Sequence, residues 1–130
     1  MIDITKDPIC PETVLSCISN DVHGALVTFV GTVRASSAGN RKVVALDIES
    51  ERKTAQRELE ALAQGIHRRW QLHDLAICHR IGRIGVGEIV LVVAIAAPHR
   101  KEAFEACQYA VDSMKQLPHM REKEVCEPTG

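Results

Sequence analysis

The most constraining feature of this sequence is the unbroken apolar run "IVLVVAIAA", which ends at Pro98. It is too short to cross a membrane, since a membrane-spanning helix needs about 20 residues. A strand made of this run is apolar on both faces, and such strands lie in the interior of a sheet. We therefore expect residues 88–98 to form a central strand.

The rest of the chain alternates between strand and helix patterns. Residues 24–34 are β-branched and apolar, and Gly31 among them predicts a bulge or a close backbone approach. Further strands are expected at 2–5, 43–51, 73–82 and 119–125, and helices at 11–18, 52–70 and 101–117. The small, polar segment 35–42 is expected to join its flanking strands as a hairpin, and "RIGVG" (83–87) is expected to be a turn.

This order of elements predicts a single α+β domain over residues 1–130, with two main helices packed on a mixed or antiparallel sheet. The formal net charge is −1, so the chain as a whole does not attract nucleic acid or an anionic membrane. The five cysteines have irregular spacing and no CxxC pair, which argues against a disulfide framework or a zinc site. The N-terminus lacks the apolar segment of a signal peptide, and we expect a reducing cytoplasm.

Several cations lie at predicted element ends, where anions can bind. Arg34 closes a strand, and a guanidinium binds oxyanions through two hydrogen bonds, although a solvated strand end is a sufficient explanation by itself. His99 and Arg100 precede a helix whose first N–H groups lack intrahelical partners, so we interpret them as an anion site. The alternative is that His99 caps the helix and Arg100 is an ordinary surface residue.

Other candidate residues have plain structural explanations. Lys115 lies at a helix C-terminus, where the helix dipole alone favours a cation, and Arg121 and Lys123 belong to a charged tail. Cys78 and His79 are adjacent on a strand, so they point to opposite faces and cannot act as a nucleophile–base pair. The residues alone therefore predict oxyanion-binding cations but no reaction.

Four motifs in order resemble the large, catalytic subunit of molybdopterin synthase. They are "TFVGTVR", "RRW" at the end of a helix, "HRIGRIGVGE" and "APHRKEAFEACQYAVDSMK". The resemblance covers roughly residues 24–124. It implies an α/β-hammerhead fold and a central homodimer, in which each subunit binds a small ubiquitin-like sulfur carrier to give a heterotetramer.

The resemblance also implies a sulfurtransferase reaction. Sulfur from the thiocarboxylated C-terminal Gly-Gly of the carrier is transferred to cyclic pyranopterin monophosphate, which forms the dithiolene of molybdopterin. No metal or other cofactor is expected. The carrier brings the sulfur, so no catalytic cysteine is needed, whereas cations are needed to hold two anionic reactants.

By motif position, Lys115 matches the family's catalytic lysine and Arg34, His99 and Arg100 match its substrate-binding residues. Phe29 and Val111 match apolar positions that line the family's pocket, and Arg69 matches the arginine of its "RW" motif.

The segment after Lys115 departs from the family pattern K-x-x-x-P-x-W-K-K-E. Here it reads "KQLPHMREKE", so counting from Pro118 puts Arg121 at the second lysine, whereas counting from Lys115 puts Glu122 there, beside Lys123. We expect Lys123 to be the second catalytic lysine and Arg121 to bind substrate. The alternative function is a homodimeric, non-catalytic module of the same fold that binds a phosphorylated small molecule.

Overall fold

The computed structural model describes residues 1–18, 24–37, 39–72, 74–118 and 120–128, so His73 and His119 of two expected strands lie outside the described residues. The elements follow one another as β1 (Ile2–Thr5), α1 (Pro11–Ser16), β2 (Ala25–Thr32), β3 (Val43–Glu49), α2 (Arg52–Trp70), β4 (Asp74–Arg80), β5 (Gly82–Gly85), β6 (Ile89–Ala97), α3 (Arg100–Met114) and β7 (Arg121–Cys126). The expected α+β class is confirmed.

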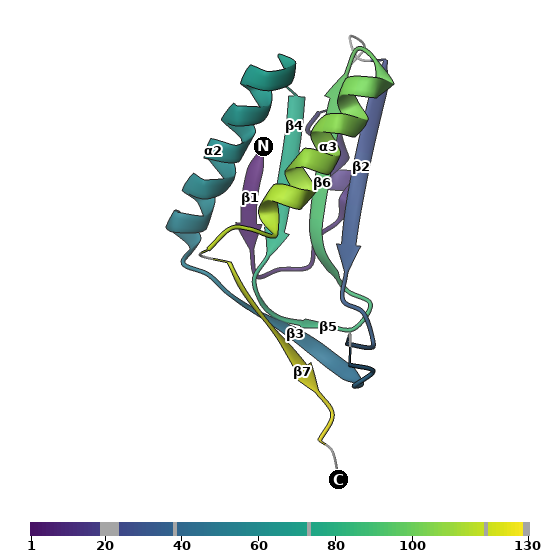
Figure 1. Cartoon of the computed structure of the whole chain (residues 1–130), viewed down its shortest axis with the longest axis vertical. Coiled ribbons are helices and arrows are strands. Elements are labelled where there is room, and N and C mark those ends of the chain that lie inside the picture. The colour runs from purple at the N-terminus through teal and green to yellow at the C-terminus, as the bar shows by residue number, and fades with distance from the viewer. Residues whose placement is uncertain (19–23, 38, 73, 119, 129–130) are drawn as a thin grey trace.

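The strands divide between two sheets (Figure 1). The larger sheet has the order β1-β4-β6-β2, and it is mixed because β1 pairs with β4 in parallel while the other pairs are antiparallel. The expectation that residues 88–98 form a central strand is confirmed, since β6 lies between β4 and β2. The smaller sheet has the order β5-β3-β7, which confirms β7 as an edge strand.

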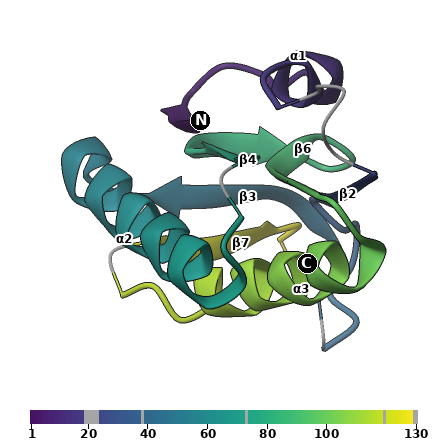
Figure 2. The same cartoon turned by 90° about the horizontal axis from the view of Figure 1, so that it is seen from above.

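Helices cover both faces of the larger sheet, and this explains why β6 is apolar throughout. Helices α2 and α3 lie side by side on one face, and α1 lies on the other (Figure 2). Val93 and Ile95 of β6 pack in the main core under α2 and α3, whereas Val92 packs with Val14 in a smaller core under α1. Burying an aliphatic side chain of this size contributes about 1.5–3 kcal/mol.

The expected hairpin between residues 24–34 and 43–51 is wrong. β2 pairs with β6, β3 pairs with β5 and β7, and an isolated bridge between Ser36 and Lys42 joins the ends of the intervening segment. The physical reason is that β6 needs an apolar strand on each side, and β2 supplies the second one. The chain therefore leaves the larger sheet after β2 and enters the smaller sheet at β3.

The expected turn at residues 83–87 is partly wrong. Gly82–Gly85 is the strand β5, paired with β3, and the turn is confined to residues 86–87. Glycine at 82 and 87 has positive φ, which favours turns, but Ile84 between them is fully buried. Burial of this one side chain holds the segment in the sheet.

Replacing Leu59 by alanine is expected to destabilise the fold by about 2–5 kcal/mol, because Leu59 is fully buried in the main core and truncation leaves a cavity. Urea unfolding of wild type and variant measures this difference. Val86→Ala removes apolar atoms from a side chain that is 42% exposed in the turn after β5, and it should change the midpoint little. Equal losses in both variants would contradict the proposed core.

Candidate active site

A cavity of about 610 Å³ lies where β2, the C-terminal end of α3 and β7 meet. It brings together four residues expected at the site from the sequence: Phe29, Arg34, Val111 and Lys115. The remaining lining residues are Val30, Gly31, Thr32, Leu46, His79, Val90, Leu91, Met114 and Glu122. The cavity thus combines an apolar lining with a few charged side chains, as small-molecule sites do.

Local structure explains how β2 and α3 reach this cavity. β2 pairs with β6 and packs against α3, and its register shifts between Gly31 and Thr32, so the predicted bulge is confirmed. A Cβ at Gly31 would lie 3.2 Å from the ring of Phe29, so glycine leaves room for this ring. Lys115 is the exposed C-cap residue of α3, and Val111 precedes it by one helical turn.

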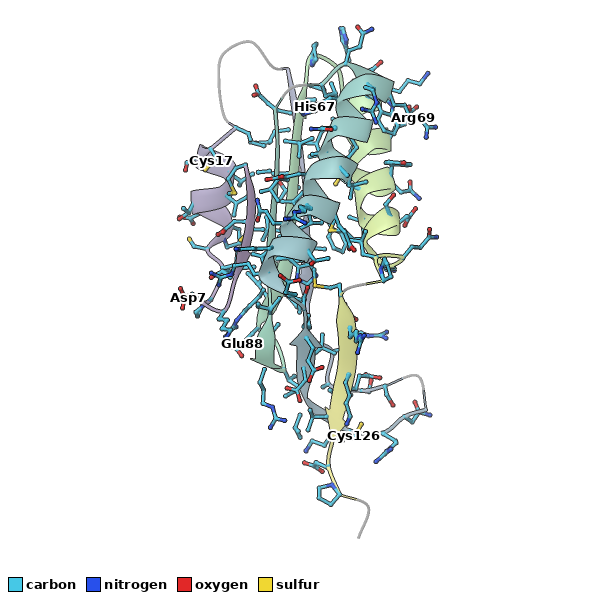
Figure 3. The ribbon with its side chains drawn as sticks, turned by 90° about the vertical axis from the view of Figure 1, so that its left-hand side faces the viewer. Asp7, Cys17, His67, Arg69, Glu88 and Cys126 are labelled. Atoms are coloured by element: carbon cyan, nitrogen blue, oxygen red, sulfur yellow. The ribbon has the colours of Figure 1, made fainter. Side chains whose placement is uncertain are left out.

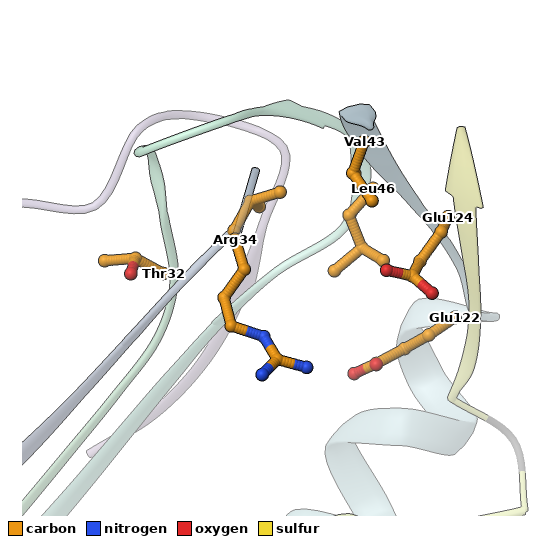
Figure 4. Close-up of a pocket in the computed structure, with 7 residues that line it drawn as sticks. Thr32, Arg34, Val43, Leu46, Glu122 and Glu124 are labelled. Carbon is orange, nitrogen blue, oxygen red and sulfur yellow. The ribbon is translucent and has the colours of Figure 1, made fainter. Parts of the chain in front are cut away.

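The charges of the cavity have both signs. Lys115 and Arg34 are exposed cations that line it, and Glu122 of β7 contributes a carboxylate. Figure 4 shows the Arg34 guanidinium and the Glu122 carboxylate turned toward each other, in an adjoining hollow of about 400 Å³. An anionic ligand at the two cations therefore meets Glu122 as well.

Arg121 and Lys123 do not line this cavity. Side chains alternate along β7, so both lie on the face opposite to Glu122. Arg121 lines a separate hollow with Glu49, Ser50 and Glu51. The alignment that counts from Lys115 puts Glu122 at the position of the family's second lysine. Glu122 is also the β7 residue that lines the cavity.

Lys123 lies opposite Asp47 in the register of β3 and β7. Arg83 binds both oxygens of Asp47 at 2.8 and 2.9 Å. These hydrogen bonds, with a smaller contribution from the charge of Lys123, hold the pKa of the Asp47 carboxyl below its usual value. Arg83 thus neutralises the carboxylate opposite Lys123.

His99 and Arg100 lie at the other end of α3, in a hollow of about 480 Å³ that Gly24, Pro98 and Lys101 also line. His99 is the N-cap residue, but its side chain makes no capping hydrogen bond, so the capping part of the alternative is wrong, whereas Arg100 is exposed as that alternative has it. A Cβ at Gly24 would lie 2.6 Å from the Pro98 carbonyl oxygen, so this close approach requires glycine. The free N–H groups and two adjacent cations suit an anion.

Arg69 lies outside both hollows. Its guanidinium stacks on the rings of Trp70 and Tyr109, at 4.6 and 5.3 Å from their centroids. Trp70 Nε1 donates a hydrogen bond of 3.1 Å to Glu105. Figure 3 shows Arg69 at the opposite end of the molecule from Cys126. Arg69 therefore joins the end of α2 to α3.

Two titratable side chains of the cavity, His79 and Glu122, are not expected at the site from the sequence. The sequence excludes His79 only as a partner for Cys78, and it offers Glu122 only as one of two alignments with the family's second lysine. The alternation of β4 places His79 on the same face as Leu75 and Ile77, toward the main core. The sequence feature that could have pointed to His79 as a site residue is its place on a strand face that is otherwise apolar.

All five cysteines are free thiols in the structure. Over the described residues, no group of three or more His, Cys, Asp or Glu side chains is arranged to hold a metal ion. Within the same part of the chain, no helix has the length and apolar character to span a membrane.

A family model described as "MoaE protein" matches residues 4–117 of the chain. The chain belongs to the MoaE family. The molybdopterin synthase catalytic subunit of Bacillus subtilis (strain 168) is 38% identical over 125 residues, which cover 96% of this chain and 79% of that protein. The resemblance found in the sequence motifs is therefore confirmed.

Solved structures agree with the MoaE assignment. Molybdopterin synthase from Staphylococcus aureus has a TM-score of 0.90 at 31% identity, covering 97% of this chain and 91% of that chain. A protein–protein complex of subunits 1 and 2 of molybdopterin-converting factor from Helicobacter pylori 26695 contains the same fold, with a TM-score of 0.74, 16% identity and coverages of 96% and 84%. The family and its members place this chain among molybdopterin synthase catalytic subunits, which are enzymes of molybdenum cofactor biosynthesis.

Proposed function

We propose that this protein transfers sulfur from the thiocarboxylated Gly-Gly terminus of a small ubiquitin-like carrier to cyclic pyranopterin monophosphate, in the cytoplasm, and so forms the molybdopterin dithiolene. The observation that carries this proposal is the meeting of Lys115 and Arg34 in one apolar-lined cavity with Phe29 and Val111. Both reactants are anions, so fixed cations hold them and stabilise the negative charge that develops during transfer.

The cysteines support a sulfur source outside this chain. None of the five lines the cavity as the structure describes it. Burial raises the pKa of the Cys78 thiol to about 11 and also raises the pKa of the Cys107 thiol. Both thiols are therefore protonated at neutral pH, and a protonated thiol is a poor nucleophile.

The carrier and a second copy of this chain are the proposed partners, in a heterotetramer with a central homodimer. The solved complex of two molybdopterin-converting factor subunits supports a protein partner for this fold. The two cation clusters support the homodimer, because they lie at opposite ends of α3, which spans about 22 Å. Lys115 of one subunit and His99 with Arg100 of its mate would together surround one small substrate.

The decisive experiment is a single-turnover assay with thiocarboxylated carrier and cyclic pyranopterin monophosphate. We expect the dithiolene product with this protein and none without it.

The alternative, a non-catalytic module, is favoured by Glu122 in the cavity and by the outward positions of Arg121 and Lys123. Binding of the pterin phosphate without any product would establish that alternative.

If Lys123 supplies the second catalytic cation, Lys123→Ala should lower turnover more than Arg121→Ala, by about 10²–10³-fold. Arg121 lines a hollow with Glu49 and Glu51, whereas the carboxylate opposite Lys123 in the β3–β7 register is bound by Arg83. The single-turnover rates of the two variants measure this ranking.

Lys42→Ala is the matched control for these two variants. It removes an exposed cation that pairs with Glu127 at 3.1 Å, away from the cavity, and it should leave the rate unchanged. If Arg121→Ala is the slower variant, the alignment that counts from Pro118 is correct and an arginine has replaced the second lysine.

A further inference from the structure

His79 is a buried titratable side chain that the proposed sulfur transfer does not yet use. It lies at the end of β4, where it pairs with Leu91 of β6 and points to the helix-covered face of the sheet. It is 4% exposed, yet it lines the same cavity as Lys115 and Glu122. Because His79 lines the cavity, a water molecule bound in the cavity can lie next to it.

The position of the proton on His79 follows from its hydrogen bond. Nδ1 lies 2.8 Å from the carbonyl oxygen of Arg80. A carbonyl oxygen can only accept a hydrogen bond, so Nδ1 carries the hydrogen. In the neutral ring, Nε2 then has a free electron pair and can accept a proton.

The surroundings keep this ring neutral at physiological pH and still allow it to take up a proton. Burial lowers the pKa of His79, and the Arg80 carbonyl and the Glu122 carboxylate offset part of this effect. The charged groups that share the cavity with His79 are Lys115 of α3, Arg34 after β2 and Glu122 of β7. The Arg80 guanidinium is held elsewhere, by Glu88 at 3.3 Å and the Lys6 carbonyl.

Sulfur transfer from a thiocarboxylate requires a second chemical step, for which a base is needed. Once the thiocarboxylate sulfur has bonded to a carbon of the substrate, that sulfur links the substrate to the acyl carbon of the carrier. Release needs water: a bond forms between the water oxygen and the acyl carbon, and the acyl C–S bond breaks. The electron pair of that bond stays on sulfur as a thiolate. One proton of the water goes to the base, and the second goes to solvent as the carrier leaves with a carboxylate.

We propose that His79 is this base: its Nε2 takes a proton from the water that cleaves the acyl–sulfur bond between carrier and substrate. The proposal rests on the proposed sulfur transfer and assigns one step of it to a residue of this chain. The Arg80 carbonyl holds the ring in the productive tautomer, and Glu122 stabilises the imidazolium that forms. This arrangement of base and carboxylate follows the general logic of oriented histidine bases.

The first test is single-turnover analysis of His79→Asn. The asparagine amide can still donate to the Arg80 carbonyl, but it has no group that accepts a proton in place of Nε2. We expect the first carbon–sulfur bond to form and its cleavage to slow by about 10²–10⁴-fold. The carrier–substrate adduct should therefore accumulate and be visible by mass spectrometry of the carrier.

A purely structural role for His79 would slow both steps and leave no adduct, and that result would overturn the proposal. His67→Asn, which makes the same change on α2 outside the cavity, should leave the rate and the adduct level as in wild type. Absence of any sulfur transfer by wild type is a separate outcome, because it would contradict the proposed function itself.

The pH dependence gives a second, independent readout. Release by wild type should fall on the acid side, as His79 becomes protonated, with a midpoint below the usual histidine value of about 6.5. Glu122→Gln removes a carboxylate that favours the imidazolium, so the midpoint should move to lower pH. An acid limb that persists unchanged in His79→Asn would overturn the proposal.

The tautomer can be measured without any reactants, by ¹⁵N NMR of the imidazole in the wild-type protein. We expect hydrogen on Nδ1 and a free Nε2 at neutral pH. Hydrogen on Nε2 would overturn the assignment of His79 as the base, whatever the activity of the protein.

Discussion

Lys115→Ala is expected to remove nearly all sulfur transfer, with a loss of about 10²–10³-fold in single-turnover rate. Lys115 is exposed at the end of α3 and lines the cavity beside Arg34, so its ammonium is free to contact an anion there. The fold should survive, because loss of a cation at a helix C-terminus costs about 0.3–1 kcal/mol.

Lys53→Ala provides the control for this experiment, since Lys53 is an exposed lysine in the first turn of α2 and does not line the cavity. Its rate should equal that of wild type, and urea unfolding should give similar midpoints for all three proteins. If Lys115→Ala keeps most of its turnover, the lysine is a helix-end cation and the assignment of its catalytic role fails.

Mixing Lys115→Ala with Arg100→Ala is expected to restore activity that neither variant has alone. In a two-fold dimer the same surface is used twice, so a shared site takes Lys115 from one subunit and Arg100 from the other. A mixed dimer then contains one intact site and one doubly damaged site. Random exchange makes half of the dimers mixed, so the mixture should reach about a quarter of wild-type activity.

The measurement needs proof that subunits exchange, for example by mass spectrometry of dimers that carry two different isotope labels. If exchange is complete and no activity returns, the shared-site model is incorrect. The two ends of α3 would then serve different ligands, and the hollow at His99 and Arg100 would need its own explanation.

Features that depend on one local pattern were predicted from the sequence. Helix α2 was expected at residues 52–70 from its apolar stripe, and Leu59 and Ile66 of that stripe are fully buried. The central position of β6 followed from its continuous apolar run. Such patterns predict burial directly, because the buried face of a helix or strand carries apolar side chains that recur with the repeat of that helix or strand.

Strand partners were harder to predict, because pairing depends on which other strands compete for the same edge. The segment 35–42 is typical of a hairpin connection, but β2 pairs with the apolar strand β6 instead of β3. For the same reason the sequence does not predict that Glu122 lines the cavity. Its orientation depends on the register of β7 against β3, which no feature of "REKEVC" itself specifies.

The pairing of β2 with β6 also determines when the cavity can form during protein synthesis. Phe29 and Arg34 leave the ribosome early, but β2 has no partner until β6 has been made. The smaller sheet is complete only later, when β7 has been made after α3 and can pair with β3. A nascent chain that has reached α3 can assemble the larger sheet and its helices, and it carries Lys115 beside an open, incomplete cavity. Recognition of substrate by this protein therefore requires β7 to have been made, and the edge of β2 that pairs with β6 is exposed until β6 has been made.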